Sequence, residues 1–325
     1  MKKRIIAIIC FTVLFLTIFT GCGAEKDSSI PGEMMEILSN AVERLSRANS
    51  IEYLYTNMSD IVLEDATRSH SFSESAIKMV RTPYTILGRM TSVNDRSGEN
   101  SESSFRETYY EIKNGILYMY VRPPFDMLNL EPEKIMVGEW QLFLEADEHL
   151  TAIVVDNAFA PLEAGLYLIK SNMNNFVSCE TIKIGSEDFY IYEGFIDIET
   201  VLNAYRIYLR DYFLEVPTTP MPLPETFDPT DEQLRAEITS GKHYDLLQWI
   251  PSLAFAENRT PITIWIDAEE LTIKKVEVDK KEAVQAMADM VSEQERSLFS
   301  PDVDYAVTIY EILGIDAFST IEMPE

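Results

Sequence analysis

The chain has 325 residues, of which 46% are hydrophobic and 11% aromatic, and its formal net charge is −27. This composition excludes an intrinsically disordered protein, and the length suits one large or two modest globular domains. A surface of this charge repels nucleic-acid backbones and anionic lipid headgroups, so no nucleic-acid partner is expected. Solubility alone is sufficient to explain the acidity.

The first residues have the pattern of a secretory signal peptide. Residues 2–4 are basic, residues 5–19 are apolar apart from two threonines, and Thr20-Gly21-Cys22 follows. The apolar run is shorter than the roughly 20 residues that a bilayer-crossing helix needs. The junction resembles the lipobox of bacterial lipoproteins, which implies that residues 1–21 are removed and that Cys22 is acylated and becomes the first mature residue. An ordinary signal peptide cut nearby and an uncleaved anchor are the alternatives.

Lipidation of Cys22 predicts where the protein is located. Without residues 1–21, which hold three cations and no acid, the formal charge becomes −30. The acyl chains, rather than protein charge, would therefore hold the chain at the membrane, and two chains suffice for stable anchoring. Residues 22–32 are small and polar, as in a tether. We expect a lipid-anchored protein on the extracytoplasmic face of the cell membrane.

The remaining cysteine is predicted to be inert. Cys10 leaves with the signal peptide and Cys22 carries the lipid, so Cys179 has no partner for an intramolecular disulfide. It lies in an alternating, strand-like run at 177–184, which favours a buried thiol over a reactive one.

The first elements after the tether are a helix and long strands. Residues 34–48 predict an amphipathic helix, because apolar side chains recur at steps of three and four. Residues 50–63 and 71–90 alternate as strands do, and Pro83 suggests an edge, a bulge or a break in the second. The polar residues 91–104 predict a hairpin loop.

A tight hairpin is predicted around Asn114-Gly115. This dipeptide joins two alternating runs, 108–113 and 116–121, and both of its residues readily adopt the positive φ that a two-residue turn requires. Five even-numbered side chains could then form one apolar-aromatic face: Tyr110, Ile112, Ile116, Tyr118 and Tyr120.

The second half of the chain alternates strands and helices. Helices are predicted at 161–171 and 199–213, and residues 281–295 form a helix or a lid. Prolines between 216 and 229 exclude a helix or a central strand there. We expect strands at 181–184, 189–192, 261–267, 271–279 and 305–310. The total of roughly eight to eleven strands, mainly antiparallel, needs helices to cover its apolar faces.

No catalytic arrangement stands out. The chain has no Gly-x-Ser-x-Gly, P-loop or dinucleotide-binding motif, and its histidines at 70, 149 and 243 have no zinc-site spacing. The densest ligand-like cluster, at 145–149, is better explained as a solvated acidic face. The acids at 228–232 do not match a calcium loop and favour a helix N-terminus. We expect no enzymatic activity, no cofactor and no metal.

The chain resembles the LolA/LppX-type bacterial lipoproteins, including uncharacterised Gram-positive relatives. The resemblance rests on the order of lipidated cysteine, helix and long antiparallel strands, and on the segments 109–118, 138–140, 262–267, 271–279, 305–309 and 323–324. It implies an α+β fold: a strongly curved, mainly antiparallel half-open β-barrel with helices plugging its concave face. It also implies one domain at 33–325, in which a helical, proline-rich segment at about 199–258 is an insertion. Several members of the family bind lipids or acylated cargo, and none of their residues is catalytic.

Two functions follow as expectations. The first is a monomeric, membrane-anchored protein that holds a lipid, acyl chain or lipopeptide on the concave face. The second is a cell-envelope interaction module whose concave face is filled by its own helices. The predicted ligand-binding side chains are Ile112, Tyr118, Tyr120, Ile262, Ile264 and Ile266, and their neighbours Glu111, Thr263 and Asp267 are predicted to face solvent. A ligand pocket should measure roughly 300–1,000 Å³.

Overall fold

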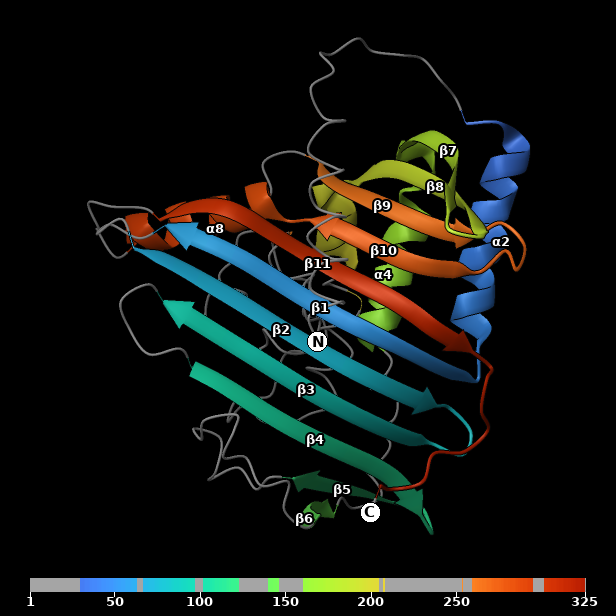
Figure 1. Ribbon diagram of the computed structural model, residues 1–325, viewed down its shortest axis with the longest axis vertical. Helices are drawn as coiled ribbons and strands as arrows, with labels where there is room; N and C mark the ends of the chain where they lie inside the picture. Colours follow the sequence, from blue (N-terminus) through green and yellow to red (C-terminus); the bar gives the residue numbers. More distant parts are fainter. Residues whose placement is uncertain are drawn as a thin grey trace.

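The computed structural model describes residues 30–62, 67–96, 102–122, 140–145, 160–204, 207, 253, 259–294 and 301–324. Within these residues, eleven strands form one antiparallel sheet in the order β6-β5-β4-β3-β2-β1-β11-β10-β9-β8-β7 (Figure 1). The edge strands β6 and β7 do not pair with each other in this part of the chain, so the sheet is open.

The first half of the sheet is a run of neighbouring strands that follows one helix. Helix α2 (Gly32–Arg47) leads into β1 (Ser50–Val62), β2 (Arg68–Val80), β3 (Thr85–Arg96), β4 (Glu102–Lys113), β5 (Ile116–Arg122) and β6 (Gln141–Glu145). The helix is confirmed close to its predicted bounds, and Pro83 lies in the turn between β2 and β3. The predicted loop at 91–104 is wrong in extent, because polar side chains such as Ser92 and Ser104, 2.6 Å apart, pair across β3 and β4.

The second half begins with a helix and ends next to the first strand. It comprises α4 (Ala160–Ser171), the 3₁₀ turn η3 (Met173–Asn175), β7 (Phe176–Ile184), β8 (Glu187–Ile196), β9 (Thr260–Asp267), β10 (Ile273–Asp279), α8 (Lys281–Gln294) and β11 (Asp302–Ile315). Strand β11 pairs with β1 from Ile51–Ile315 to Val62–Asp302. The two predicted strand sets are therefore the two halves of one sheet.

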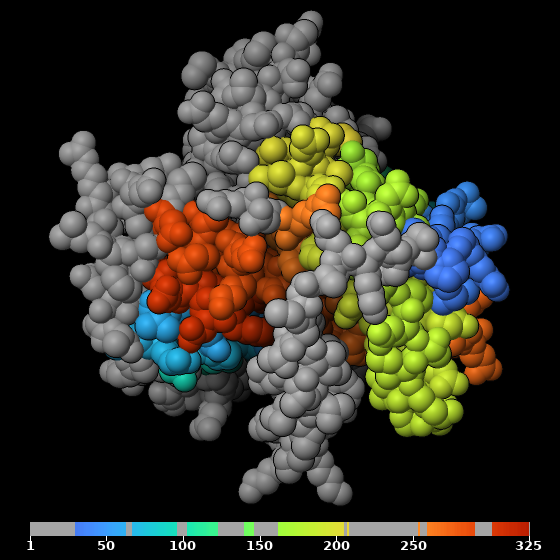
Figure 2. All heavy atoms as spheres, turned by 90° about the horizontal axis from the view of Figure 1, so that it is seen from above, coloured from blue at the N-terminus to red at the C-terminus, as the bar shows by residue number. Residues whose placement is uncertain are grey.

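Helices cover one face of this sheet and bury the main core against it. Helix α2 contributes Leu38, Ala41 and Leu45, which belong to the stripe that its sequence predicts, and also Val42. Helix α4 passes behind β9, β10 and β11 (Figure 1), and α2 lies beside the yellow-green residues of 160–196 (Figure 2). We call this the helix-covered face and the opposite one the outer face.

The Asn114-Gly115 hairpin is confirmed. Asn114 and Gly115 have φ of 54° and 80°, the left-handed region that a two-residue turn needs. The turn pairs Lys113 with Ile116 and continues to Glu107 opposite Arg122.

The C-terminal tail crosses to the outer face of the first half of the sheet. The hydroxyl of Tyr109 donates to the carbonyl oxygen of Ile321 over 3.2 Å, and the indole nitrogen of Trp140 donates to that of Pro324 over 2.7 Å. The tail thereby links β11 to β4 and Trp140, far from it in the sheet order.

Within the predicted insertion at about 199–258, the structure describes residues 199–204, 207 and 253. Residues 198–204 are helical, in keeping with the beginning of the helix predicted at 199, and the proline-rich segment lies outside the described residues. Cys22 and the signal segment lie outside them as well. Across the described part of the chain, no helix combines the length and apolar character that spanning a bilayer requires.

Candidate ligand-binding site

Four of the six predicted ligand-binding side chains lie on the helix-covered face. Ile262, Ile264 and Ile266 of β9 are 2%, 0% and 0% exposed and belong to the main core. Ile112 of β4 is partly buried against the same core. These positions are consistent with either a ligand face or ordinary core packing.

Tyr118 and Tyr120 do not share that face, so the prediction that all six side chains converge on one face is wrong. In the hairpin, Ile112 lies opposite Leu117, whereas Tyr118 lies opposite Glu111 and Tyr120 opposite Tyr109. Directly opposed residues of an antiparallel pair point to one side. A two-residue turn therefore places even-numbered residues of β4 with odd-numbered residues of β5, and the shared parity that the sequence suggested does not mean a shared face.

The predicted solvent-facing neighbours differ in their surroundings. Glu111 and Thr263 are partly buried, and Asp267 is buried, contrary to the prediction. The carboxylate of Asp267 accepts hydrogen bonds from the backbone N–H groups of Glu269 and Glu270, at 2.9 and 2.8 Å. Asp267 therefore forms the turn between β9 and β10 instead of standing in solvent.

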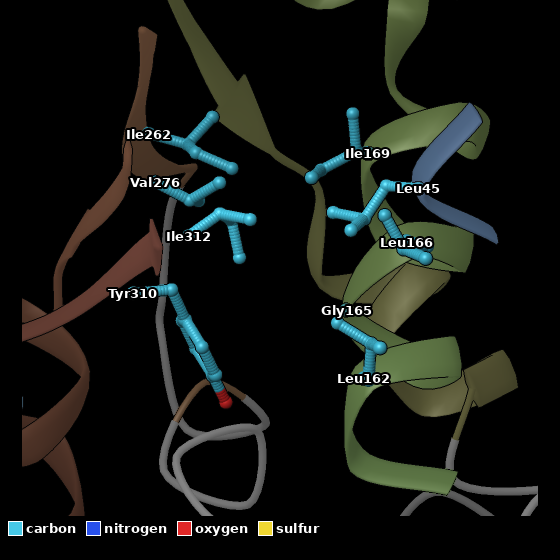
Figure 3. Close-up of a pocket in the computed structure, with 9 residues that line it drawn as sticks. All are labelled: Leu45, Leu162, Gly165, Leu166, Ile169, Ile262, Val276, Tyr310 and Ile312. Carbon is cyan, nitrogen blue, oxygen red and sulfur yellow. The ribbon is translucent and has the colours of Figure 1, made fainter. Parts of the chain in front are cut away.

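An apolar seam separates the sheet from its helices. Ile262, Val276, Tyr310 and Ile312 form the wall on the sheet side, and they face a helical wall made of Leu45, Leu162, Gly165, Leu166 and Ile169 (Figure 3). The cavity between the walls measures about 30 Å³. It is about a tenth of the smallest usual ligand pocket, roughly 300 Å³, so an acyl chain would fit only if the walls separated.

A second, larger cavity lies at one end of the same seam. It measures about 370 Å³ and is bounded by Arg44 of α2, by Glu270 and residues 272–274 around the start of β10, and by residues 312–315 and Ala317 around the end of β11. Ile312 lines both cavities. Sequence reasoning missed this site, because neither Arg44 nor Lys274 belongs to a motif.

Most of the candidate metal-binding residues lie outside the described part of the chain. No group of three or more potential metal ligands is present among the described residues. His70 contacts Asp60, 2.5 Å away, and the rest of the 145–149 cluster beyond Glu145, with His243 and the acids at 228–232, lies outside the described part. Cys179 is half-buried, and burial raises the pKa of its thiol, which disfavours the reactive thiolate.

Comparisons with known proteins show no close relative. No known protein family matches the chain, and no curated protein matches it either. One solved structure with some similarity is the beta-barrel-like protein of a domain of unknown function, DUF1849, from Brucella abortus. The two chains are 8% identical, the match covers 83% of this chain and 98% of the other, and the TM-score is 0.22.

Proposed function

We propose that this protein is a membrane-anchored, extracytoplasmic lipoprotein of the LolA/LppX-like type that binds a lipid, acyl chain or lipopeptide without catalysing a reaction. The observation that carries this proposal is the apolar seam of Figure 3, in which every lining residue apart from glycine has an apolar or aromatic side chain. The ligand would lie between α4 and the sheet, against Ile262 of the predicted ligand face.

The energetics of the seam predict that its two walls separate only when a ligand enters between them. Separating two apolar walls in water costs about 25 cal/mol for each Å² exposed. An acyl chain that enters between the walls removes the same surface from water, so the open state is stable only when it is filled. Such a site is closed without ligand, in agreement with a cavity of about 30 Å³.

Filling the seam tests this proposal. Gly165 lines the cavity from α4, so Gly165→Leu places a side chain where the ligand would lie. We expect wild-type protein to bind a fluorescent fatty acid and Gly165→Leu to lower its affinity by at least about tenfold, the equivalent of 1.4 kcal/mol. Binding is measured by fluorescence titration, and thermal unfolding checks that the variant folds.

Two controls separate filling from other effects. Gly165→Ala gives the helix nearly the same gain in propensity while filling little of the seam. Lys170→Leu adds an exposed leucine to the same helix outside the cavity lining. Both should bind the fluorescent fatty acid as wild type does. Equal affinity of Gly165→Leu and wild type would place the ligand elsewhere.

The interaction-module alternative rests on the small volume of the seam. About 30 Å³ is what tight packing of helices on a sheet leaves behind, and a face that is permanently filled by its own helices leaves only surfaces for contact with an envelope protein. Native mass spectrometry of protein isolated from its own host distinguishes the two functions. A co-purified species of lipid mass supports the carrier, and its absence together with no binding of the fluorescent fatty acid supports the module.

Membrane anchoring is tested at Cys22. We expect Cys22→Ser to move the protein from the membrane fraction to the soluble or secreted fraction, because the acyl chains would be its principal attachment. Cell fractionation with metabolic labelling by a fatty acid measures this, and Cys179→Ser is the matched control. Full retention of Cys22→Ser in the membrane fraction would contradict the lipobox interpretation.

A further inference from the structure

The larger cavity is built by a local departure of two strands from regular pairing. Strand β10 pairs with β11 only from Lys275–Glu311 to Asp279–Val307. Beyond this point β11 continues to Ile315 against β1 alone. The two strands therefore separate over the last four residues of β11, and the cavity of about 370 Å³ lies in the gap.

Two β-bulges face each other across this gap. In the β9–β10 ladder, Ile273 pairs with Ile266 and Lys275 with Trp265, which leaves Lys274 as the extra residue. In the β1–β11 ladder, Leu313 is the extra residue in the same way, between Ile312 and Gly314. Both bulged residues line the cavity. Bulges re-aim side chains and are enriched next to functional sites, which makes this gap a candidate site.

The cavity carries two cations and one acid in a strongly acidic protein. The Nη1 of Arg44 donates to the carbonyl oxygen of Glu270 over 2.8 Å, and its other donors have no partner among the described residues. The Nζ of Lys274 lies 2.7 Å from the carboxylate of Glu270. Among the side chains that line the cavity, two cations therefore accompany one carboxylate, although the whole chain carries −27.

The polar cavity and the apolar seam share a wall. Ile312 lines both, and the adjacent α2 residues Leu45 and Arg44 line the seam and the cavity respectively. One end of this composite site is thus wholly apolar, and the other offers the guanidinium of Arg44 and the ammonium of Lys274. An apolar tail with an anionic group at one end has the same distribution of polarity.

We propose that the cavity between β10 and β11 binds the anionic headgroup, carboxylate or phosphate, of an amphipathic ligand whose apolar tail occupies the seam. Arg44 is the main hydrogen-bond donor, since a guanidinium presents two parallel N–H groups to a carboxylate or phosphate. Lys274 is the second cation and moves from Glu270 to the ligand. This inference rests on the proposed function and adds to it the chemical class of the ligand.

The test compares one apolar chain with and without its charge. The probes are a fatty acid with a fluorophore at its tail end and the methyl ester of the same molecule, both titrated into the full chain. We expect wild type to bind the acid about tenfold to hundredfold more tightly than the ester, as for a hydrogen bond to a charged group. In Arg44→Gln and Lys274→Gln the preference should fall, and in the double variant it should vanish while ester binding is unchanged.

Matched variants test whether the preference for the acid depends on the cations that line the cavity or on the net charge of the protein. Arg47→Gln removes a cation one turn further along α2, from a side chain that does not line the cavity, and should keep the preference for the acid. Glu270→Gln removes the competing carboxylate and should strengthen binding of the acid alone. The acid-to-ester ratio is measured within each variant, so a general loss of stability does not imitate the effect.

Each remaining outcome decides a different point. Equal binding of acid and ester by wild type overturns the headgroup site and leaves the apolar carrier in place. Binding of neither probe overturns the carrier and the headgroup assignment together. Inorganic phosphate, titrated alone and followed by NMR, covers the case of a free small anion. Tight phosphate binding that Arg44→Gln abolishes, without any binding of the fatty-acid probe, would assign the cavity to a soluble anion instead of a lipid.

Discussion

Glu107→Ala should lower the free energy of unfolding by about 3–5 kcal/mol, the cost of breaking a buried ion pair by removing one partner. Glu107 is 1% exposed and lies on the outer face between Arg89 of β3 and Arg122 of β5, its directly opposed residues in the two ladders. The Nε of Arg89 lies 2.7 Å from one carboxylate oxygen, and the Nε of Arg122 lies 2.5 Å from the other.

The asymmetry between the two arginines explains the size of this effect. Arg89 is mostly exposed, so water replaces the carboxylate there at little cost. Arg122 is 7% exposed and its guanidinium lies 4.4 Å from the centre of the Trp140 ring, so water cannot replace the lost carboxylate in the same way. Removing Glu107 therefore takes a carboxylate away from a buried guanidinium, and the loss of one member of a buried ion pair is costly.

Chemical denaturation of Glu107→Ala measures this, with Glu111→Ala as the control. Glu111 lies four residues along the same strand and pairs with Lys113, which is largely exposed, so its loss should be several-fold smaller. The double variant Glu107→Leu with Arg122→Leu should be more stable than Glu107→Ala, because it removes both buried charges. If Glu107→Ala loses no more free energy of unfolding than Glu111→Ala does, the interactions of Glu107 with Arg89 and Arg122 do not stabilise the fold.

The sequence predicted those elements whose signals are local. The stripe of α2 and the Asn114-Gly115 turn depend only on residues within a few positions of one another, and both were found as expected. The pairing of β1 with β11 joins residues about 250 positions apart, and no local pattern specifies it. The sheet order could thus be known only as mainly antiparallel.

In the candidate site, too, the sequence predicted what depends on one regular strand and missed what depends on turns and bulges. Alternation placed Ile262, Ile264 and Ile266 together because all three lie on one regular strand. It failed for Tyr118 and Tyr120, where the turn changes which parities coincide, and it gave no sign of the cavity at Lys274. A bulge adds one residue and reverses the alternation beyond it, so the side chains that line a bulged gap are those that a strict period of two misplaces.

Lys280→Met should raise the free energy of unfolding at pH 7, by up to about 3 kcal/mol. Lys280 is 4% exposed, and burial lowers its pKa from 10.5 to about 8. Each tenfold weakening of proton binding corresponds to about 1.4 kcal/mol. The Nζ of Lys280 donates to the Oδ1 of Asn57 over 2.7 Å. Methionine removes the buried charge, and Oδ1 still accepts a hydrogen bond from the hydroxyl of Thr308 over 3.1 Å, so the substitution leaves this oxygen satisfied.

The pH dependence of the free energy of unfolding shows whether the buried charge of Lys280 is what lowers the stability of wild type. Below pH 8 Lys280 is protonated in both states and the folded protein bears the full cost of the buried charge. Between about pH 8 and pH 10.5 the unfolded chain binds more protons at this site than the folded one, so the stability of wild type should rise with pH. Buried tyrosines such as Tyr109, whose pKa is raised to about 12, act in the opposite direction above about pH 10. The contribution of Lys280 to the pH dependence of stability is therefore best measured between about pH 7.5 and pH 9.5.

Urea unfolding of wild type, Lys280→Met and the control Lys281→Met across that window completes the test. Lys281 is the exposed neighbour, so its substitution should leave both the stability and its slope with pH unchanged. In Lys280→Met the rise with pH should disappear, and its curve should converge on that of wild type towards the alkaline end. If Lys280→Met is instead less stable than wild type at every pH, the hydrogen bond to Asn57 outweighs desolvation, and the lysine stabilises the packing of β10 against β1 and β11.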